Sequence, residues 1–249
     1  MKEWLLAGAL LAALPAHADE VRVLAAGAAK HALEEIAPAF ERASGHTLRA
    51  SYDTVGAQRD RVLQAAPGAV ADLVVLSDAA LQQLRAADRL QPRAAVPIGR
   101  VLVSLAAPAG QPLPDISDAA RLRAALQAAP SIAFADPARG ATAGTHFAKV
   151  LDALALRAEM EPKMTVLPFG VDVITAVAAG KFALGVSQSS EIMAHPGVRF
   201  VGGLPPPYAQ ATGYGAALAS GSAGAAALLE YLAQPAAQAA WRASGFTAP

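Results

Sequence analysis

The 249-residue sequence contains no cysteine and no excess of either charge. Without cysteine, a disulfide framework, a thiol nucleophile and a lipid attached to an N-terminal cysteine are excluded. Twenty basic residues balance twenty acidic residues, so no broad positive field would attract nucleic acid or an anionic membrane. Beyond the first 18 residues, no apolar stretch is long enough to span a bilayer. We therefore expect no nucleic-acid partner and no membrane insertion.

Several catalytic signatures are missing as well. The sequence has no Gly-x-Ser-x-Gly elbow, no His-Glu-x-x-His pair and no Gly-Lys-Ser/Thr phosphate loop. Its five histidines are too widely spaced to predict a zinc site. We expect neither a metal nor an organic cofactor.

The first 18 residues have the features of a secretory signal peptide. Lys2 provides a positive charge, residues 4–14 form an apolar run too short to cross a bilayer, and the Ala-His-Ala sequence at residues 16–18 matches a cleavage site. We expect residues 1–18 to be removed, and the rest to be exported into a bacterial periplasm without a lipid anchor.

The remaining sequence alternates between short apolar strands and helical patterns. This rhythm predicts an α/β fold with parallel sheets and helices on both faces. In such folds ligands bind beyond the carboxyl ends of the strands. The predicted strands are residues 21–25, 48–52, 73–76, 101–106, 132–135, 165–167, 184–187 and 198–202, with helices such as 29–44 and 58–66 between them.

Small residues occupy four of the strand-to-helix junctions. A helix start without bulky side chains exposes backbone N–H groups, and the positive end of the helix dipole adds to their attraction for an anion. Because all four junctions fall at the ligand-binding edge of the sheets, we predict that they hold one small anion from several sides. The junctions are residues 26–28, 53–57, 140–145 and 169–172.

Two segments are predicted to cross between two lobes. Residues 97–100 lead into an apolar strand, and the proline-rich segment 203–207 precedes another extended stretch. These crossings divide the chain into a first lobe of residues 19–98 and 205–249 and a second lobe of residues 99–204. The ligand would lie in the cleft between the lobes, which would close over it by a hinge motion.

Five stretches, taken in order, cover essentially the whole chain after residue 18: VLAAGAAKHALEEIAPAFERASGHTLRASYDTVGAQRDRV, ADLVVLSDAALQQL, FADPARGATAGTHFAKVLDAL, GVDVITAVAAGKFALGVSQSSEI and LLEYLAQPAAQAAWRASGF. Their order and spacing resemble the molybdate-binding family of extracytoplasmic solute-binding proteins. The resemblance implies the type II periplasmic binding fold, with two α/β lobes, two crossover strands and an oxyanion in the cleft. It also implies delivery of the ligand to an ABC permease, and we expect a monomer.

The sequence departs from this family at several implied site positions. Ala28 stands where the family has a serine, Gln188 where it has a tyrosine, and residues 53–56 where it has a serine cluster. The backbone positions Ala143 and Val171 are retained, together with Thr54. The expected ligand is therefore a molybdate-like oxyanion or an organic carboxylate.

The predicted ligand-binding residues combine these positions with polar neighbours. Arg59 would bind a planar carboxylate with two hydrogen bonds, although a cation early in a helix is more often a solvated surface group. Ser189 has an alternative role as a helix cap, whereas Thr54 and Thr142, as loop hydroxyls near glycine, have no evident packing role. Asp53 would repel an anion unless it pairs with a cation. The full set is Gly27, Ala28, Thr54, Gly56, Arg59, Thr142, Ala143, Val171, Gln188 and Ser189.

An enzymatic relative of the family, a periplasmic aconitate isomerase, supplies an alternative function. Such an enzyme binds a tricarboxylate and shifts a double bond by proton transfer, which requires a base beside the carboxylate-binding groups. His31 and His146 are the imidazoles near the predicted junctions. Capture of a solute for an ABC importer, without catalysis, is the main interpretation, and isomerisation in the same cleft is the alternative.

Overall fold

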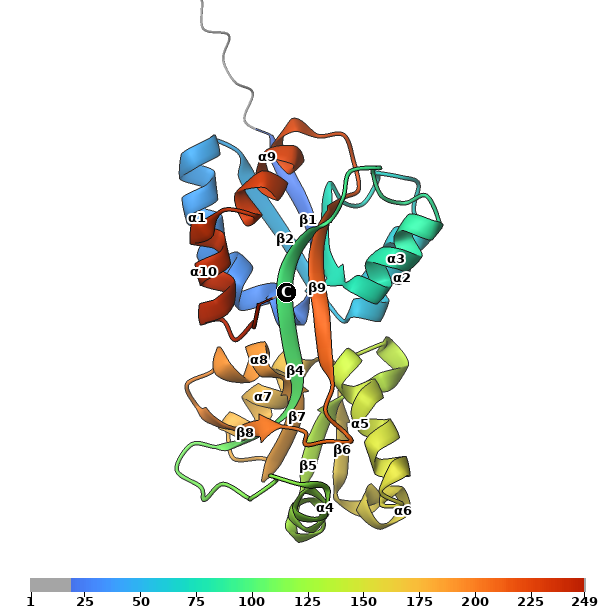
Figure 1. The fold of residues 1–249 in the computed structure, drawn as a ribbon, viewed down its shortest axis with the longest axis vertical. Helices are drawn as coiled ribbons and strands as arrows, with labels where there is room; N and C mark the ends of the chain where they lie inside the picture. Colours follow the sequence, from blue (N-terminus) through green and yellow to red (C-terminus); the bar gives the residue numbers. More distant parts are fainter. Residues whose placement is uncertain (1–18, 249) are drawn as a thin grey trace, which may run out of the picture.

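The computed structural model describes residues 19–248, which fold into two α/β lobes, one above the other in Figure 1. Two neighbouring strands, β4 (Val96–Pro108) and β9 (Ala211–Leu218), run along the middle of the molecule. The predicted signal peptide, residues 1–18, lies outside the described residues. Within them, no helix has both the length and the apolar character needed to cross a membrane. The predicted two-lobed α/β fold is confirmed.

The first lobe is built on a mixed sheet with the strand order β2-β1-β3-β9-β4. In Figure 1, α1, α9 and α10 lie on one side of it and α2 and α3 on the other. Its elements besides the two long strands are β1 (Glu20–Ala26), η1 (Gly27–Ala29), α1 (Lys30–Ser44), β2 (Thr47–Asp53), α2 (Val55–Gln64), β3 (Leu73–Ser77), α3 (Asp78–Ala86), α9 (Ala223–Leu232) and α10 (Pro235–Ala243).

The second lobe has the strand order β4-β7-β5-β6, with β8 also paired to β4. Helices α7 and α8 lie on one side and α5 and α6 on the other (Figure 1). Its elements are α4 (Ala119–Ala128), β5 (Ile132–Ala135), η2 (Pro137–Arg139), α5 (Thr142–Ala153), α6 (Arg157–Met160), η3 (Glu161–Lys163), β6 (Met164–Leu167), α7 (Gly170–Ala178), β7 (Leu184–Gln188), α8 (Ser189–Met193) and β8 (Val198–Gly203).

Strand β4 belongs to both sheets. Its residues 96–102 pair with β9 in the first sheet, and residues 103–108 pair with β7 and β8 in the second. The sequence predicted parallel sheets, and this is wrong for every pair that includes β4 or β9, because these pairs are antiparallel. The strands of the βα units in each lobe end at the cleft. A strand that arrives from the other lobe starts at the cleft, so it runs antiparallel to them.

Each lobe has its own apolar core. The first is centred on Phe40 and Trp241, whereas the second lobe buries separate clusters on the two faces of its sheet, around Phe147 and around Val177. The two faces are filled separately because successive side chains of a strand point in opposite directions.

We propose lobe boundaries at the positions expected from the sequence, with residues 19–98 and 205–249 in the first lobe and residues 99–204 in the second. Burial on β4 supports a crossing close to this point. Val101 packs in the core of the first lobe and Val103 in that of the second.

A buried carboxylate ties together three segments of the first lobe. Asp72, just before β3, accepts hydrogen bonds from the backbone N–H and the guanidinium of Arg22 on β1, each at 2.9 Å. It also accepts one from the Ser220 hydroxyl at 2.8 Å. The hydrogen bond from the Arg22 side chain is the largest effect that lowers the pKa of Asp72.

The Asp72→Asn variant should therefore lose about 2 kcal/mol of unfolding free energy at neutral pH, the worth of hydrogen bonds to a charged group. Because folding lowers the pKa of Asp72, its contribution is present above the unfolded-state pKa of about 3.9 and is lost as pH falls through the lower folded-state value. Urea unfolding of both proteins should show the difference at neutral pH and a smaller one below about pH 4. Asp115→Asn, at an exposed ion pair with Arg121, should change nothing measurable.

Candidate functional site

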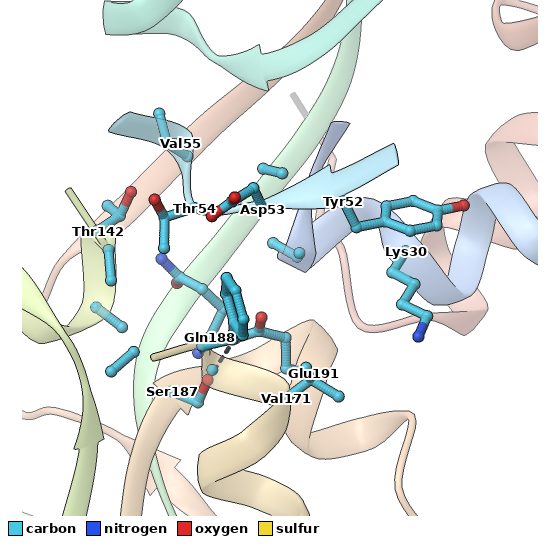
Figure 2. Close-up of a pocket in the computed structure, with 18 of the residues that line it drawn as sticks. Lys30, Tyr52, Asp53, Thr54, Val55, Thr142, Val171, Ser187, Gln188 and Glu191 are labelled. Carbon is cyan, nitrogen blue, oxygen red and sulfur yellow. Dashed lines mark hydrogen bonds between the residues drawn. The ribbon is translucent and has the colours of Figure 1, made fainter. Parts of the chain in front are cut away.

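A cleft lies where the carboxyl ends of strands from both lobes meet (Figure 2). Its volume of about 270 Å³ is below the ~300–1,000 Å³ of pockets that hold drug-sized ligands, so its ligand should be small. All four predicted small-residue junctions contribute to its lining. The lining residues are Ala26, Gly27, Ala28, Lys30, Tyr52, Asp53, Thr54, Val55, Ala135, Ala141, Thr142, Ala143, Phe169, Gly170, Val171, Ser187, Gln188, Glu191 and Tyr214.

Helix starts from both lobes supply backbone donors to this cleft. Val55 opens α2, Thr142 and Ala143 open α5, and Gly170 and Val171 open α7. The first N–H groups of a helix have no acceptor within that helix. Groups of this kind, at the positive end of a helix dipole, favour a negatively charged ligand.

Gln188, at the end of β7, presents an unsatisfied amide. The residue is only 4% exposed, yet neither Oε1 nor Nε2 has a hydrogen-bond partner among the described residues. Figure 2 shows this amide pointing toward Thr54 and Thr142. Leaving buried polar groups unpaired costs about 1–3 kcal/mol each. A ligand that supplies both a donor and an acceptor would account for it.

Glu191, in the first turn of α8, holds its carboxyl group next to Gln188. The Ser187 hydroxyl and the Gln188 backbone N–H, the latter at 3.3 Å, both donate to Oε2. Burial raises the pKa of Glu191, and these hydrogen bonds offset only part of that rise. Gly27 leaves room for the carboxyl, since a Cβ there would lie 2.8 Å from Oε1; a Cβ on Gly170 would overlap Oε2.

The other charged groups of the cleft are already paired. The Lys30 ammonium lies 3.9 Å from Glu34 and 5.8 Å from the centre of the Tyr52 ring, and Figure 2 shows it directed away from Gln188. The Asp53 carboxylate lies 3.1 Å from the Arg139 guanidinium. An anion would therefore be held mainly by hydrogen bonds and helix dipoles, without a free cation from these pairs.

Five residues at one edge of the cleft form a contact between the lobes, which we call the interlobe latch: Asp53, Thr54 and Gly56 in the first lobe, Arg139 and Gly140 in the second. The Thr54 hydroxyl donates to the Arg139 carbonyl, and the Gly56 N–H donates to the Gly140 carbonyl at 3.2 Å. The Asp53–Arg139 ion pair completes it. The described structure therefore has its lobes in direct contact.

Seven of the ten predicted ligand-binding residues line the cleft: Gly27, Ala28, Thr54, Thr142, Ala143, Val171 and Gln188. Gly56, Arg59 and Ser189 do not. Gly56 belongs to the latch, and Arg59 turns to Asp60, 2.7 Å away. The Ser189 hydroxyl donates to the carbonyl of Gly245 and accepts from the backbone of β4, so it holds the C-terminal segment in place. Thr54 has a structural role the sequence did not indicate, since it caps α2 as well as joining the lobes.

Neither predicted histidine lines the cleft. His31 is exposed on α1, and the His146 Nε2 lies 2.7 Å from the Tyr208 carbonyl. Sequence reasoning missed Glu191, Ser187 and Tyr214 as cleft residues. The spacing of Gln188 and Glu191, a polar residue followed three positions later by glutamate, is typical of a helix start and could have pointed to Glu191.

Comparisons with known proteins agree with the two-lobed fold. Residues 21–247 match the sequence model of the family described as bacterial extracellular solute-binding protein. The chain is 32% identical to an aconitate isomerase of a Pseudomonas species over 233 residues, which is 90% of this chain and 85% of the relative. The periplasmic molybdate-binding protein of Azotobacter vinelandii has a TM-score of 0.71 at 20% identity, covering 92% of this chain and 99% of that one. The sulfate-binding protein SubI of Mycobacterium tuberculosis has a TM-score of 0.67 at 20% identity, covering 92% and 86%.

Proposed function

Because the chain belongs to the family of bacterial extracellular solute-binding proteins, we propose that its cleft captures a small anion in the periplasm and delivers it to an ABC importer. The resemblance to molybdate-binding proteins predicted from the sequence is confirmed at the level of family and fold. Export through a cleaved signal peptide and function as a monomer remain parts of this proposal.

The observation that carries the proposal is the buried, unpartnered Gln188 amide beside helix starts from both lobes. The helix N–H groups favour an anion, and the amide is satisfied by a ligand with both donor and acceptor atoms, or by an acceptor atom of the ligand together with a bridging water that donates to Oε1. Gly27, Ala28, Thr142, Ala143 and Val171 would form the backbone cradle.

An organic carboxylate fits this cleft better than a tetrahedral oxyanion. An oxyanion is well held by several free hydroxyls, but the Thr54 and Ser187 hydroxyls already donate to the Arg139 carbonyl and to Glu191. Gln188 also replaces the tyrosine that the resemblance implies. The Gln188 amide and the helix N–H groups suit the flat, acceptor-rich edge of a carboxylate.

A thermal-shift screen tests this proposal. The purified protein would be heated at neutral pH with molybdate, tungstate, sulfate and phosphate, and with di- and tricarboxylates including cis- and trans-aconitate. A ligand at ~100 times its Kd should add roughly 2.7 kcal/mol to the unfolding free energy. Stabilisation by carboxylates alone is the expected result. Stabilisation by molybdate or tungstate alone would contradict the carboxylate, and no stabilisation by any anion would contradict the binding function.

Isomerisation of a tricarboxylate is a second candidate, favoured by the 32% identity with an aconitate isomerase. The histidines predicted for proton transfer lie outside the cleft lining, so the His31→Ala and His146→Ala variants should keep whatever turnover of cis- and trans-aconitate the unchanged protein shows. Nuclear magnetic resonance spectra of the substrates after incubation with each protein would measure the interconversion of cis- and trans-aconitate. Loss of turnover in either variant would restore a catalytic role for that histidine.

A further inference from the structure

One oxygen of the Glu191 carboxyl is fully engaged and the other faces the cleft. Oε2 accepts from the Ser187 hydroxyl and from the Gln188 N–H. Oε1 lies beside Gly27, where a Cβ would come within 2.8 Å of it, so only glycine tolerates the carboxyl in this position. Among the described residues, no hydrogen bond reaches Oε1, and Glu191 itself lines the cleft.

No ion pair neutralises Glu191 in the described part of the chain. Of the elements packed against α8, η1 and β7 bring no charged side chain. Asp172 lies on α7, and the buried Tyr214 lies on β9, where the Glu191 charge adds to the rise in its pKa caused by burial. Asp53 and Lys30, which also line the cleft, are each paired with another residue. The arginines on neighbouring elements, Arg100, Arg199 and Arg242, are exposed, and none of them forms an ion pair with Glu191 in the described part of the chain.

These surroundings disfavour a carboxylate at position 191. An ionised carboxyl without a cation would also repel the anion that we propose for the cleft. Burial raises the pKa of Glu191, in line with a neutral acid. In the neutral acid the proton belongs on Oε1, because Oε2 already accepts two hydrogen bonds.

We propose that Glu191 selects its ligand as a neutral acid, donating the O–H at Oε1 to a carboxylate oxygen of the bound anion. This assignment rests on the proposed capture of an organic carboxylate. It means that binding of the carboxylate depends on protonation of Glu191. Once Glu191 is ionised, binding requires uptake of one proton, so the affinity falls by up to about tenfold for each further pH unit.

The protonation state can be tested without a ligand. At about pH 6, where ordinary glutamates near pKa 4.3 are ionised, the infrared difference spectrum between the unchanged protein and Glu191→Gln should contain the C=O band of a protonated carboxyl. Glu230→Gln, the same change at an exposed position, should remove no such band. Absence of the band in the Glu191→Gln difference spectrum would overturn the proposal.

The ligand contact is tested by calorimetry with trans-aconitate from about pH 6 to pH 9, where the ligand carboxyls stay ionised. Affinity should fall as pH rises in the unchanged protein. Glu191→Gln, whose amide replaces the acid O–H by an N–H donor, should bind within about threefold of the unchanged protein at the lower pH and show a flat profile. Ser187→Ala should move the fall to higher pH, because the Ser187 hydrogen bond lowers the pKa of Glu191.

Two results would overturn this role while leaving carboxylate capture intact. One is a flat pH profile in the unchanged protein. The other is a loss of affinity above tenfold in Glu191→Gln when its melting temperature and circular dichroism are unchanged. If no carboxylate bound at any pH, the proposed function and the Glu191 assignment would both fail, and the infrared band would still report whether the acid is neutral.

Discussion

The Gln188→Met variant should bind the carboxylate ligand about 10- to 100-fold more weakly, while the unliganded protein should be as stable as before or slightly more stable. Loss of a hydrogen bond to a charged ligand costs about 1.5–3 kcal/mol, and 1.4 kcal/mol is a tenfold change in Kd. Stability should not fall, because methionine has a similar shape and removes two buried polar atoms that have no partner. Calorimetry would measure the affinity, and urea unfolding would measure the stability.

A matched control is available in the first lobe. Gln58 is buried as well, but its Nε2 donates to the carbonyls of Ser51 at 2.8 Å and Ala25 at 3.3 Å. Gln58→Met should therefore lose about 1–3 kcal/mol of stability and have a smaller effect on ligand affinity. If Gln188→Met bound the ligand normally, or lost as much stability as Gln58→Met, Gln188 would be a structural residue instead of a ligand-binding one.

The Gly56→Ala variant should prevent the lobes from closing and weaken binding by about 10- to 100-fold. A Cβ at residue 56 would lie 2.7 Å from the Gly140 Cα and 2.9 Å from the Arg139 carbonyl oxygen, which are backbone atoms and cannot turn aside. Overpacking of this kind costs about 1–3 kcal/mol. Alanine is a better helix former than glycine, so α2 itself should not be destabilised.

Small-angle X-ray scattering with and without ligand would show directly whether the lobes close in Gly56→Ala. The unchanged protein should contract on binding, and Gly56→Ala should contract less. Gly221→Ala is the control, since a Cβ there meets no atom within 4 Å. Full contraction and unchanged affinity in Gly56→Ala would mean that the latch is not needed for binding.

Local patterns in the sequence were sufficient to predict most of the elements. The strand expected at residues 132–135 is β5, and the strand expected at residues 184–187 is β7, which ends one residue later. This succeeds because apolar runs and small residues act within a few positions of the chain. The helix expected at residues 58–66 begins earlier, at Val55, because the Thr54 hydroxyl caps it.

Direction and pairing were less accessible to sequence reasoning. The antiparallel course of β4 and β9 follows from their passage between the lobes, and a strand has the same local pattern in either direction. The partly buried carboxyl of Glu191 was missed for a related reason. A glutamate early in a helix is usually solvated, and only the packing of Gly27 and Gly170 around it makes it a cleft residue.

The α/β class, the element order and the four small-residue junctions that line the cleft could be predicted from local sequence patterns, because these depend on neighbours along the chain. Which side chains are free to meet a ligand depends on tertiary contacts instead. Gly56, Arg59 and Ser189 have suitable chemistry and position, but each is already held by a partner, and Gln188 is left without one. That choice depends on contacts between residues far apart in the chain, such as Gly56 with Gly140 and Ser189 with Gly245.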